Sequence, residues 1–266
     1  MMLKTSFSLF TACLLFVHIG FVALADDSKN MYLKQLFVRN GDTLPYRILF
    51  PENYDPKKEY PLVVFLHGSG ERGNNNESQL KHGGSLFLAD SNRQTYPAIV
   101  VFPQCSKSGF WSNMTEAKDT VKKTRVFNFK TDGPPTKDMA LLMELVKWLP
   151  AQHKINESQN CMMGLSMGGM GTLEIIRRMP GTFKRAVSIC GGANPATAKE
   201  LGKTKIWLTH GMKDEVVLPE YSIKMAEALR AEKMQVELTL FPEANHNSWD
   251  ATFRLPNLLP WLFGKK

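Results

Sequence analysis

One serine of this sequence lies in a setting suited to covalent chemistry. Ser166 is part of Gly164-Leu165-Ser166-Met167-Gly168-Gly169, between a short apolar run and a stretch with helical spacing of apolar residues. Glycine on each side permits the tight packing of a sharp strand-to-helix turn, which would present the hydroxyl at the edge of a sheet. The N-terminus of the following helix favours developing negative charge. The segment therefore predicts Ser166 as a nucleophile.

A serine hydroxyl reacts near neutral pH only when a base takes its proton. Two histidines follow Ser166 in the sequence, His210 and His246. His210 directly precedes Gly211 at the end of a predicted strand, where we expect it to help build the turn. His246 lies in a polar loop before the last predicted helix, at the same rim of the sheet as the serine, and we predict that it is the base.

The base in turn needs an acid that orients it. Asp214 follows a predicted strand at its carboxyl end, where the ligand-facing groups of parallel sheets gather. The order Ser166, Asp214, His246 along the chain is also that of α/β-hydrolases. Glu215 is the closest rival as the acid, and a loop-capping role is the alternative for Asp214. Position and order together favour Asp214.

Ester or amide hydrolysis also needs donors for the oxyanion of the tetrahedral intermediate. The backbone N–H of Met167, directly after the nucleophile, is one candidate. The loop His67-Gly68-Ser69-Gly70-Glu71-Arg72-Gly73 follows an apolar run, and its glycines allow the backbone to approach a substrate. We predict the Ser69 N–H as the second donor, and we expect Glu71 and Arg72 to pair with each other and hold this loop.

Two tryptophans are candidates for a substrate pocket, Trp111 and Trp249. Both lie in loops that we expect near the rim of the sheet, and we predict that they wall the acyl or alcohol pocket. The alternative for Trp249 is that it only anchors the last helix.

The rest of the sequence predicts the elements that position these residues. Apolar runs without polar alternation are typical of strands covered on both faces, and runs with helical spacing lie between them. The predicted strands are 32–38, 44–50, 62–66, 97–102, 161–163, 186–189, 205–208 and 236–240, and the predicted helices 137–149, 167–179, 221–234 and 258–263. Strands 32–38 and 44–50 form a β-hairpin, and the alternation that follows predicts a mainly parallel sheet with helices on both sides. We expect 112–135 to be a weakly structured excursion over the sheet rim.

The N-terminus is typical of a secretory signal peptide over residues 1–25. Lys4 precedes an apolar run, and Ala23 and Ala25 supply small residues before a predicted cleavage site. The alternative is an uncleaved anchor helix. No Pro-, Gly- or Ser-rich linker divides the remainder, so we predict one catalytic domain over 26–266, exported to the periplasm or the outside of the cell and not held at the membrane after cleavage.

Composition limits the remaining classes of function. The 266 residues carry 33 Lys and Arg against 25 Asp and Glu, and 43% are apolar, as in ordinary soluble proteins. The densest basic group lacks a known nucleic-acid motif, and we expect no nucleic-acid partner; its members are Lys118, Lys122, Lys123, Arg125 and Lys130. We interpret this group as a solvated face of a loop; attraction to an acidic polysaccharide is the weaker alternative. No cysteine–histidine spacing typical of zinc occurs, so we expect neither a metal site nor a cofactor.

Three cysteines remain after the predicted cleavage, Cys105, Cys161 and Cys190. An odd number in an exported protein allows at most one internal disulfide. Cys105 and Cys190 both follow predicted strands at the same rim. A bridge between them, with Cys161 buried and free, and three free thiols are both open hypotheses.

Several longer motifs occur in order along nearly the whole mature chain. They are LHGSGERGNNNESQLKHGG (66–84), FPQC (102–105) with a following Trp111, GLSMGGMGTLE (164–174), SICGG (188–192), HGMKDEVV (210–217) and NHNSWDATF (245–253). With them the sequence resembles secreted carboxylesterases of the α/β-hydrolase superfamily, in the branch of predicted peptidases near dienelactone hydrolases and polyhydroxyalkanoate depolymerases. Segment 155–160 departs from that pattern, which usually has an Asp and an Arg there.

The resemblance implies an α/β-hydrolase fold with a mostly parallel, twisted sheet of about eight strands. It also implies hydrolysis of acyl esters without a cofactor, with Ser166, Asp214 and His246 as the triad. The sequence thus predicts a serine carboxylesterase whose substrate is a small-molecule or polysaccharide-linked ester. A serine peptidase acting on small peptides and a catalytically inactive binding protein are the alternatives. The acyl group, the alcohol and the oligomeric state are left open.

Overall fold

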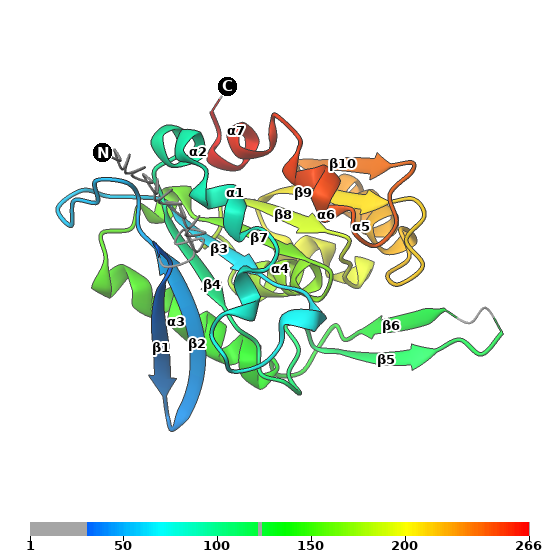
Figure 1. Ribbon diagram of the computed structural model, residues 1–266. Helices are drawn as coiled ribbons and strands as arrows, with labels where there is room; N and C mark the ends of the chain where they lie inside the picture. The colour runs from blue at the N-terminus through cyan, green and yellow to red at the C-terminus, as the bar shows by residue number, and fades with distance from the viewer. Residues whose placement is uncertain (1–30, 122–123, 266) are drawn as a thin grey trace, which may run out of the picture.

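The computed structural model describes residues 31–121 and 124–265, so the predicted signal peptide lies outside the described residues. An eight-stranded sheet in the order β1-β2-β4-β3-β7-β8-β9-β10 forms the centre (Figure 1). Two antiparallel pairs define one edge of the sheet: β1 (Leu33–Arg39) and β2 (Asp42–Leu49) form a hairpin, and β2 pairs with β4 (Ile99–Pro103). The remaining neighbours are parallel: β3 (Leu62–Leu66), β7 (Cys161–Leu165), β8 (Arg185–Ile189), β9 (Lys205–Gly211) and β10 (Val236–Phe241).

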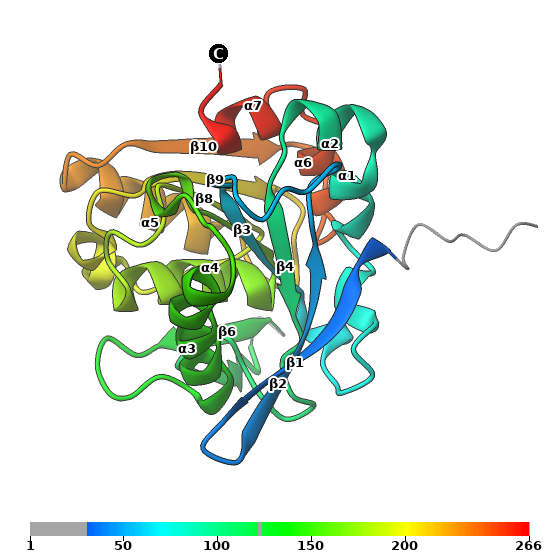
Figure 2. The same ribbon diagram turned by 90° about the vertical axis from the view of Figure 1, so that its left-hand side faces the viewer.

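Helices cover both faces of the sheet (Figure 2). One face carries α3 (Lys137–Gln152), α4 (Met167–Arg178) and α5 (Glu220–Ala231), and the other carries α1 (Gly84–Leu88), α2 (Asp90–Thr95), α6 (Trp249–Phe253) and α7 (Leu258–Phe263). Within β3, Val64 packs in the core of the first face and Val63 and Phe65 in that of the second. Burial on both sides explains why the strands are continuous apolar runs. The predicted fold class is confirmed.

Short 3₁₀ turns lie in the connections of the sheet. They are η2 (Ser69–Glu71), η3 (Ser78–Leu80), η4 (Glu157–Gln159) and η5 (Pro195–Leu201). The longest helix, α3, starts at the side-chain cap of Thr136, whose Oγ1 accepts the N–H of Met139, and continues past the predicted end at Leu149 through Pro150.

The segment predicted to be weakly structured contains a two-stranded hairpin instead. β5 (Met114–Lys118) and β6 (Arg125–Phe129) pair antiparallel and project from the body of the molecule (Figure 1). The base of the hairpin is held by Phe127, which is buried against Met170 and Val217 and whose N–H donates to Tyr221 Oη at 2.8 Å. Long-range packing at this base, which local sequence does not reveal, orders the segment.

The hypothesis of a disulfide between Cys105 and Cys190 is wrong for this structure, in which Cys105, Cys161 and Cys190 are all buried and free. Cys105 follows β4 and Cys190 follows β8, and β3 and β7 lie between these strands. Three interstrand spacings amount to about 14 Å, whereas a disulfide requires Cα atoms within about 7 Å. The two cysteines therefore lie at the same edge of the sheet but too far apart to form a disulfide.

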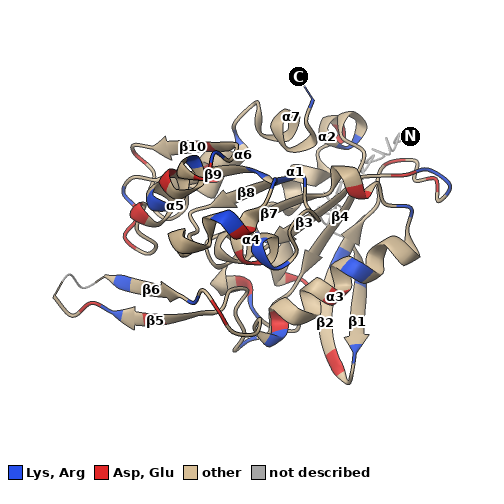
Figure 3. Ribbon diagram, turned by 180° about the vertical axis from the view of Figure 1, so that it is seen from behind, with Lys and Arg blue, Asp and Glu red and all other residues tan. Residues whose placement is uncertain are grey.

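Charged residues of both signs are interspersed over the ribbon, without a long segment of one sign (Figure 3). Among the described residues, every helix is too short or too polar to cross a bilayer.

Candidate active site

The turn that carries Ser166 is strained. Ser166 lies between β7 and α4 with φ 53° and ψ −119°, a conformation that residues other than glycine rarely adopt. Gly164 and Gly168 allow the close approach of the chain, because a methyl group at Gly168 would lie 2.0 Å from the carbonyl oxygen of Leu66. Strain of this kind at a strand-to-helix turn presents the serine hydroxyl above the sheet.

The structure brings Ser166, His246 and Asp214 together in one chain of hydrogen bonds. Ser166 Oγ lies 2.9 Å from His246 Nε2, and His246 Nδ1 lies 2.8 Å from Asp214 Oδ2. A carboxylate only accepts hydrogen bonds, so Nδ1 carries the ring proton and Nε2 offers its lone pair to the serine hydroxyl. This arrangement leaves His246 ready to take the proton of Ser166.

Asp214, the acid at the end of these hydrogen bonds, is held in place by several donors. Asp214 is buried, and its Oδ1 accepts the backbone N–H groups of Val216 and Val217, each at 2.9 Å. Burial opposes its ionisation, but hydrogen bonds from His210, His246 and the Val217 backbone outweigh burial and hold the pKa of the carboxyl well below its usual range. Glu215, the rival acid, is exposed to solvent.

His210 does more than build a turn. It is completely buried, its Nδ1 lies 2.7 Å from Ser222 Oγ, and its Nε2 lies 2.8 Å from the Val217 carbonyl oxygen. The same Nε2 is 3.3 Å from Asp214 Oδ2. A carbonyl oxygen only accepts, so Nε2 carries a hydrogen that also faces the carboxylate. The signal available in the sequence was the short spacing of His210 and Asp214.

The two predicted oxyanion donors border Ser166. Met167 begins α4, and Ser69 begins η2 directly after Gly68. A methyl group at Gly68 would lie 3.7 Å from Ser166 Cβ, so this loop packs against the nucleophile. Among the backbone hydrogen bonds of turns, loops and caps in the described residues, none is donated by the N–H of Met167 or of Ser69. The role of these two N–H groups as oxyanion donors stays a prediction.

His67 shapes the loop that carries Ser69, a role that sequence reasoning missed. The ring is buried, its Nε2 accepts the Cys105 N–H at 2.9 Å, and its Nδ1 donates to the Gly68 carbonyl oxygen at 2.6 Å. Burial lowers the pKa of His67 to about 4, so the ring is neutral at pH 7. A neutral ring with one donor and one acceptor ties the end of β3 to the end of β4.

The two predicted pocket tryptophans have different surroundings. Trp249 is half-buried, with its ring centroid 5.5 Å from that of His246 and 5.0 Å from that of His82. Trp111 is fully buried against His67, with centroids 5.5 Å apart, and is packed on Gly171. Trp111 thus belongs to the core, where it has no surface to offer a substrate.

Glu71 and Arg72 do not pair with each other. Arg72 donates to the carbonyl oxygens of Ser69 at 3.0 Å and Gly109 at 3.2 Å. The Glu71 carboxylate instead lies 3.7 Å from His82 Nε2. The expectation that Glu71 and Arg72 hold the loop as a pair was wrong, because adjacent residues of this tight turn point to different neighbours.

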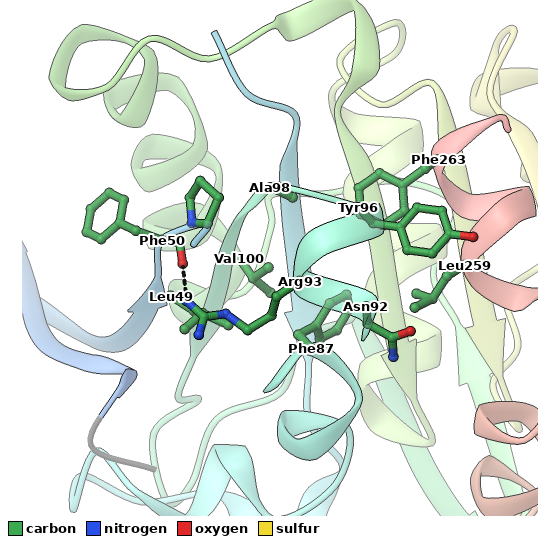
Figure 4. A pocket seen from close by; sticks show the side chains of 11 residues that line it. Leu49, Phe50, Phe87, Asn92, Arg93, Tyr96, Ala98, Val100, Leu259 and Phe263 are labelled. Carbon is green, nitrogen blue, oxygen red and sulfur yellow. Dashed lines mark hydrogen bonds between the residues drawn. The ribbon is translucent and has the colours of Figure 1, made fainter. Parts of the chain in front are cut away.

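A small cavity, in whose lining Ser166, Asp214 and His246 take no part, lies beside the start of β4 (Figure 4). Its lining comes from the end of β2, from α2, from α7 and from the start of β4, and includes Leu49, Arg93 and Phe263. Its volume is about 10 Å³, room for one water molecule, and Arg93 Nε has no hydrogen-bond partner among the described residues. This cavity is too small for a substrate.

Fold and site define the class of protein as an α/β-hydrolase. A family model described as "Putative esterase" matches residues 39–252, and the chain belongs to this family. The chain is thus an α/β-hydrolase of this family.

Solved structures agree with this assignment. A thermostable esterase is 28% identical with a TM-score of 0.78, and the match covers 89% of this chain and 64% of that protein, less than two thirds of its length. A ferulic acid esterase from Anaeromyces mucronatus, in complex with ferulic acid, is 15% identical with a TM-score of 0.64, covering 88% and 90%. An acylaminoacyl peptidase from Pyrococcus horikoshii is 15% identical with a TM-score of 0.54, covering 81% and 37%.

Proposed function

We propose that the protein is a serine carboxylesterase that hydrolyses acyl esters through an acyl-enzyme intermediate. The observation that carries the proposal is the unbroken hydrogen-bonded chain from Ser166 Oγ through both nitrogens of His246 to Asp214. This chain supplies the nucleophile, the base and the orienting acid that acyl transfer requires.

The reaction proceeds in two halves. Ser166 Oγ attacks the ester carbonyl while His246 Nε2 takes its proton, and the Asp214 carboxylate stabilises the imidazolium. The N–H groups of Ser69 and Met167 hold the oxyanion, and collapse of the tetrahedral intermediate releases the alcohol, which receives the proton from His246. His246 then takes a proton from water, and the hydroxide attacks the acyl-enzyme. Collapse of this second intermediate breaks the bond to Ser166 Oγ, which receives the proton from His246 as the acid is released.

The proposal extends to export and to substrate. Residues 1–25 act as a cleavable signal peptide, so N-terminal sequencing of the exported protein should start at Asp26. Trp249 beside His246 offers an aromatic wall to the substrate, and a ferulic acid complex among the structural neighbours supports aryl esters as substrates to test. A start at Met1 would favour the uncleaved anchor.

Esterase activity is tested by initial rates on 4-nitrophenyl acetate, butyrate and octanoate and on methyl ferulate. Ser166→Ala should lower kcat by about 10⁴-fold or more, whereas Ser158→Ala, on an exposed serine remote from the triad, should not change it. Equal background rates in wild type and Ser166→Ala, together with failure of a serine-directed phosphonate to label Ser166, would favour a binding protein instead.

A serine peptidase is the second candidate, because the structural neighbours include an acylaminoacyl peptidase. The same triad cleaves amides as well as esters. Rates on an acyl-amino-acid 4-nitroanilide and on the matched ester distinguish the two functions. We expect turnover of the ester to dominate, and the reverse preference would assign the peptidase function.

A further inference from the structure

Three potential metal ligands meet at the candidate active site although no sequence motif joins them. Within the residues that the structure describes, Cys190 Sγ, a carboxylate oxygen of Asp214 and a ring nitrogen of His246 all lie within 4.8 Å of one another. Cys190 follows β8, and its N–H donates to the Thr209 carbonyl oxygen at 2.8 Å, which fixes it beside the strand that leads to Asp214. Thiolate, carboxylate and imidazole together form a donor set that Zn²⁺ and Cd²⁺ prefer.

We propose that Cys190, Asp214 and His246 form an inhibitory site for a thiophilic divalent cation, with Zn²⁺ as the natural candidate. Zinc takes sulfur at about 2.3 Å and nitrogen or oxygen at about 2.1 Å, so tetrahedral ligands lie about 3.5 Å apart. The widest of the present separations, at most 4.8 Å, has to contract by about 1 Å, and the hydrogen-bonded pair His246 Nδ1 and Asp214 Oδ2, now 2.8 Å apart, has to open by somewhat less. Metal binding itself does not depend on the esterase function, whereas inhibition rests on it.

The groups behind these ligands already suit a bound cation. Asp214 Oδ1 is held by two backbone N–H groups, and His210 Nε2 lies 3.3 Å from Oδ2, so the carboxylate is oriented without His246. Outer hydrogen bonds of this kind orient ligands in metal sites. Ser248 is fully buried near Cys190, and its Oγ has no other hydrogen-bond partner among the described residues. A metal-bound thiolate is the stronger acceptor that this hydroxyl lacks.

The ion can enter from the side of His246. The His246 side chain is 22% exposed, whereas that of Asp214 is fully buried and Cys190 has no exposed surface. A cysteine thiol carries its proton at neutral pH, so the sulfur is protonated without metal. Binding therefore breaks the S–H bond, releases one proton to solvent and forms the metal–sulfur bond with no change of oxidation state.

Inhibition follows from the chemistry of the imidazole ring. A cation on Nε2 occupies the lone pair that faces Ser166. A cation on Nδ1 displaces the hydrogen from that atom, and the neutral ring then carries its hydrogen on Nε2. In both cases His246 has no lone pair for the serine proton, so the first step of acyl transfer stops.

The test uses the full mature chain, freed of metal with a chelator and then titrated with Zn²⁺ for activity and with Cd²⁺ for ultraviolet absorbance of the cadmium–thiolate bond. The matched variants are Cys190→Ser, Cys105→Ser and Cys161→Ser, three buried cysteines of which only Cys190 lies in the cluster. Wild type, Cys105→Ser and Cys161→Ser should show a Cd²⁺ band that saturates at one equivalent. Cys190→Ser should lose the band, and its Zn²⁺ inhibition constant should weaken by about tenfold or more.

A band that persists in Cys190→Ser, or its absence from wild type, overturns the proposal, as does equal Zn²⁺ inhibition of wild type and Cys190→Ser. Should Cys190→Ser fail to fold, Asp214→Asn replaces it, and unchanged Cd²⁺ affinity in that variant also overturns the site. Ser166→Ala separates the two proposals: it should keep the Cd²⁺ band while losing turnover. A band in a wild-type protein without esterase activity would uphold the metal site and reject the proposed function.

Discussion

His210 Nε2 lies 3.3 Å from Asp214 Oδ2, the same oxygen that accepts the hydrogen bond from His246 Nδ1 at 2.8 Å. The carboxylate is thus held between two imidazoles, one fully buried and one at the surface of the site. Only His246 contacts Ser166. In the proposed reaction, His210 would therefore act through the position and the charge of Asp214, as a positioning residue.

Removal of His210 should weaken catalysis without removing the triad. For His210→Leu we expect kcat to fall about tenfold to hundredfold, because a hydrogen bond to a charged group contributes about 1.5–3 kcal/mol. KM should change little. Loss of this donor also raises the pKa of Asp214, so the loss of kcat that follows protonation of this carboxylate, at the acid limb of the profile, should begin at higher pH.

The control for that prediction is His210→Gln, whose amide N–H can replace the Nε2 donor. We expect it to recover most of the rate and the position of the acid limb. If His210→Leu and His210→Gln have equal kcat values and equal pH profiles, His210 has only a packing role.

Stability should depend on pH through His67. Its pKa is lowered to about 4 in the folded protein by burial, against about 6.5 in an unfolded chain. Between these values only the unfolded chain takes up the proton, so the free energy of unfolding should fall as the pH falls from about 6.5 to 4, by about 3 kcal/mol. Urea denaturation at pH 7, 6, 5 and 4.5 measures this slope.

The matched variant is His67→Gln, which has no ring to protonate. It should be less stable at pH 7, because the Cys105 N–H and the Gly68 carbonyl oxygen lose their partner, and its slope between pH 6.5 and 4 should be shallower than that of wild type. An unchanged slope would show that other groups cause the acid sensitivity.

A buried carboxylate in α4 should contribute strongly to stability. Glu174 is 5% exposed and accepts Arg177 Nε at 2.9 Å and Arg178 Nε at 2.6 Å, and Arg178 also donates to the carbonyl oxygen of Gly133 after the β5–β6 hairpin. Glu174→Ala removes the buried carboxylate from two partly buried arginines, of which Arg177 keeps only the more exposed Glu200, and we expect the free energy of unfolding to fall by about 3 kcal/mol.

Glu200→Ala is the comparison for that variant, because Glu200 pairs with the same Arg177 at 3.1 Å but its side chain is 48% exposed. A pair of this kind contributes about 1 kcal/mol or less. Chemical denaturation of both variants measures the difference, and equal losses would contradict a special role for Glu174.

Gly168, two residues after Ser166, should tolerate no side chain. Gly168→Ala would place a methyl group 2.0 Å from the Leu66 carbonyl oxygen, which is backbone and cannot rotate away. We expect a loss of about 2–3 kcal/mol or more in unfolding free energy, together with loss of activity. At Gly70, in the loop beside Ser69, an added methyl group would meet nothing within 4 Å. The unfolding free energy of Gly70→Ala should therefore lie within about 0.5 kcal/mol of that of wild type.

Much of the fold could be predicted because its causes are local. The runs at 62–66, 161–163 and 205–208 lack polar alternation because both faces of their strands are covered, and they correspond to β3, β7 and β9. The turn at Ser166 depends on glycines within a few residues. The β5–β6 hairpin could not be predicted in this way, because packing of Phe127 on Met170 and Val217 orders it from far along the chain.

By itself, the sequence determined the alternation of strands and helices and the strand–turn–helix around Ser166, since both depend on short-range backbone geometry and on the periodicity of burial. Only the tertiary structure decided which groups meet across strands. The strand order separates Cys105 from Cys190 and brings Cys190 beside Asp214 and His246. It also places His210 against Asp214 and buries Trp111 in the core. Such contacts depend on how separate elements pack together, which no local stretch of sequence specifies.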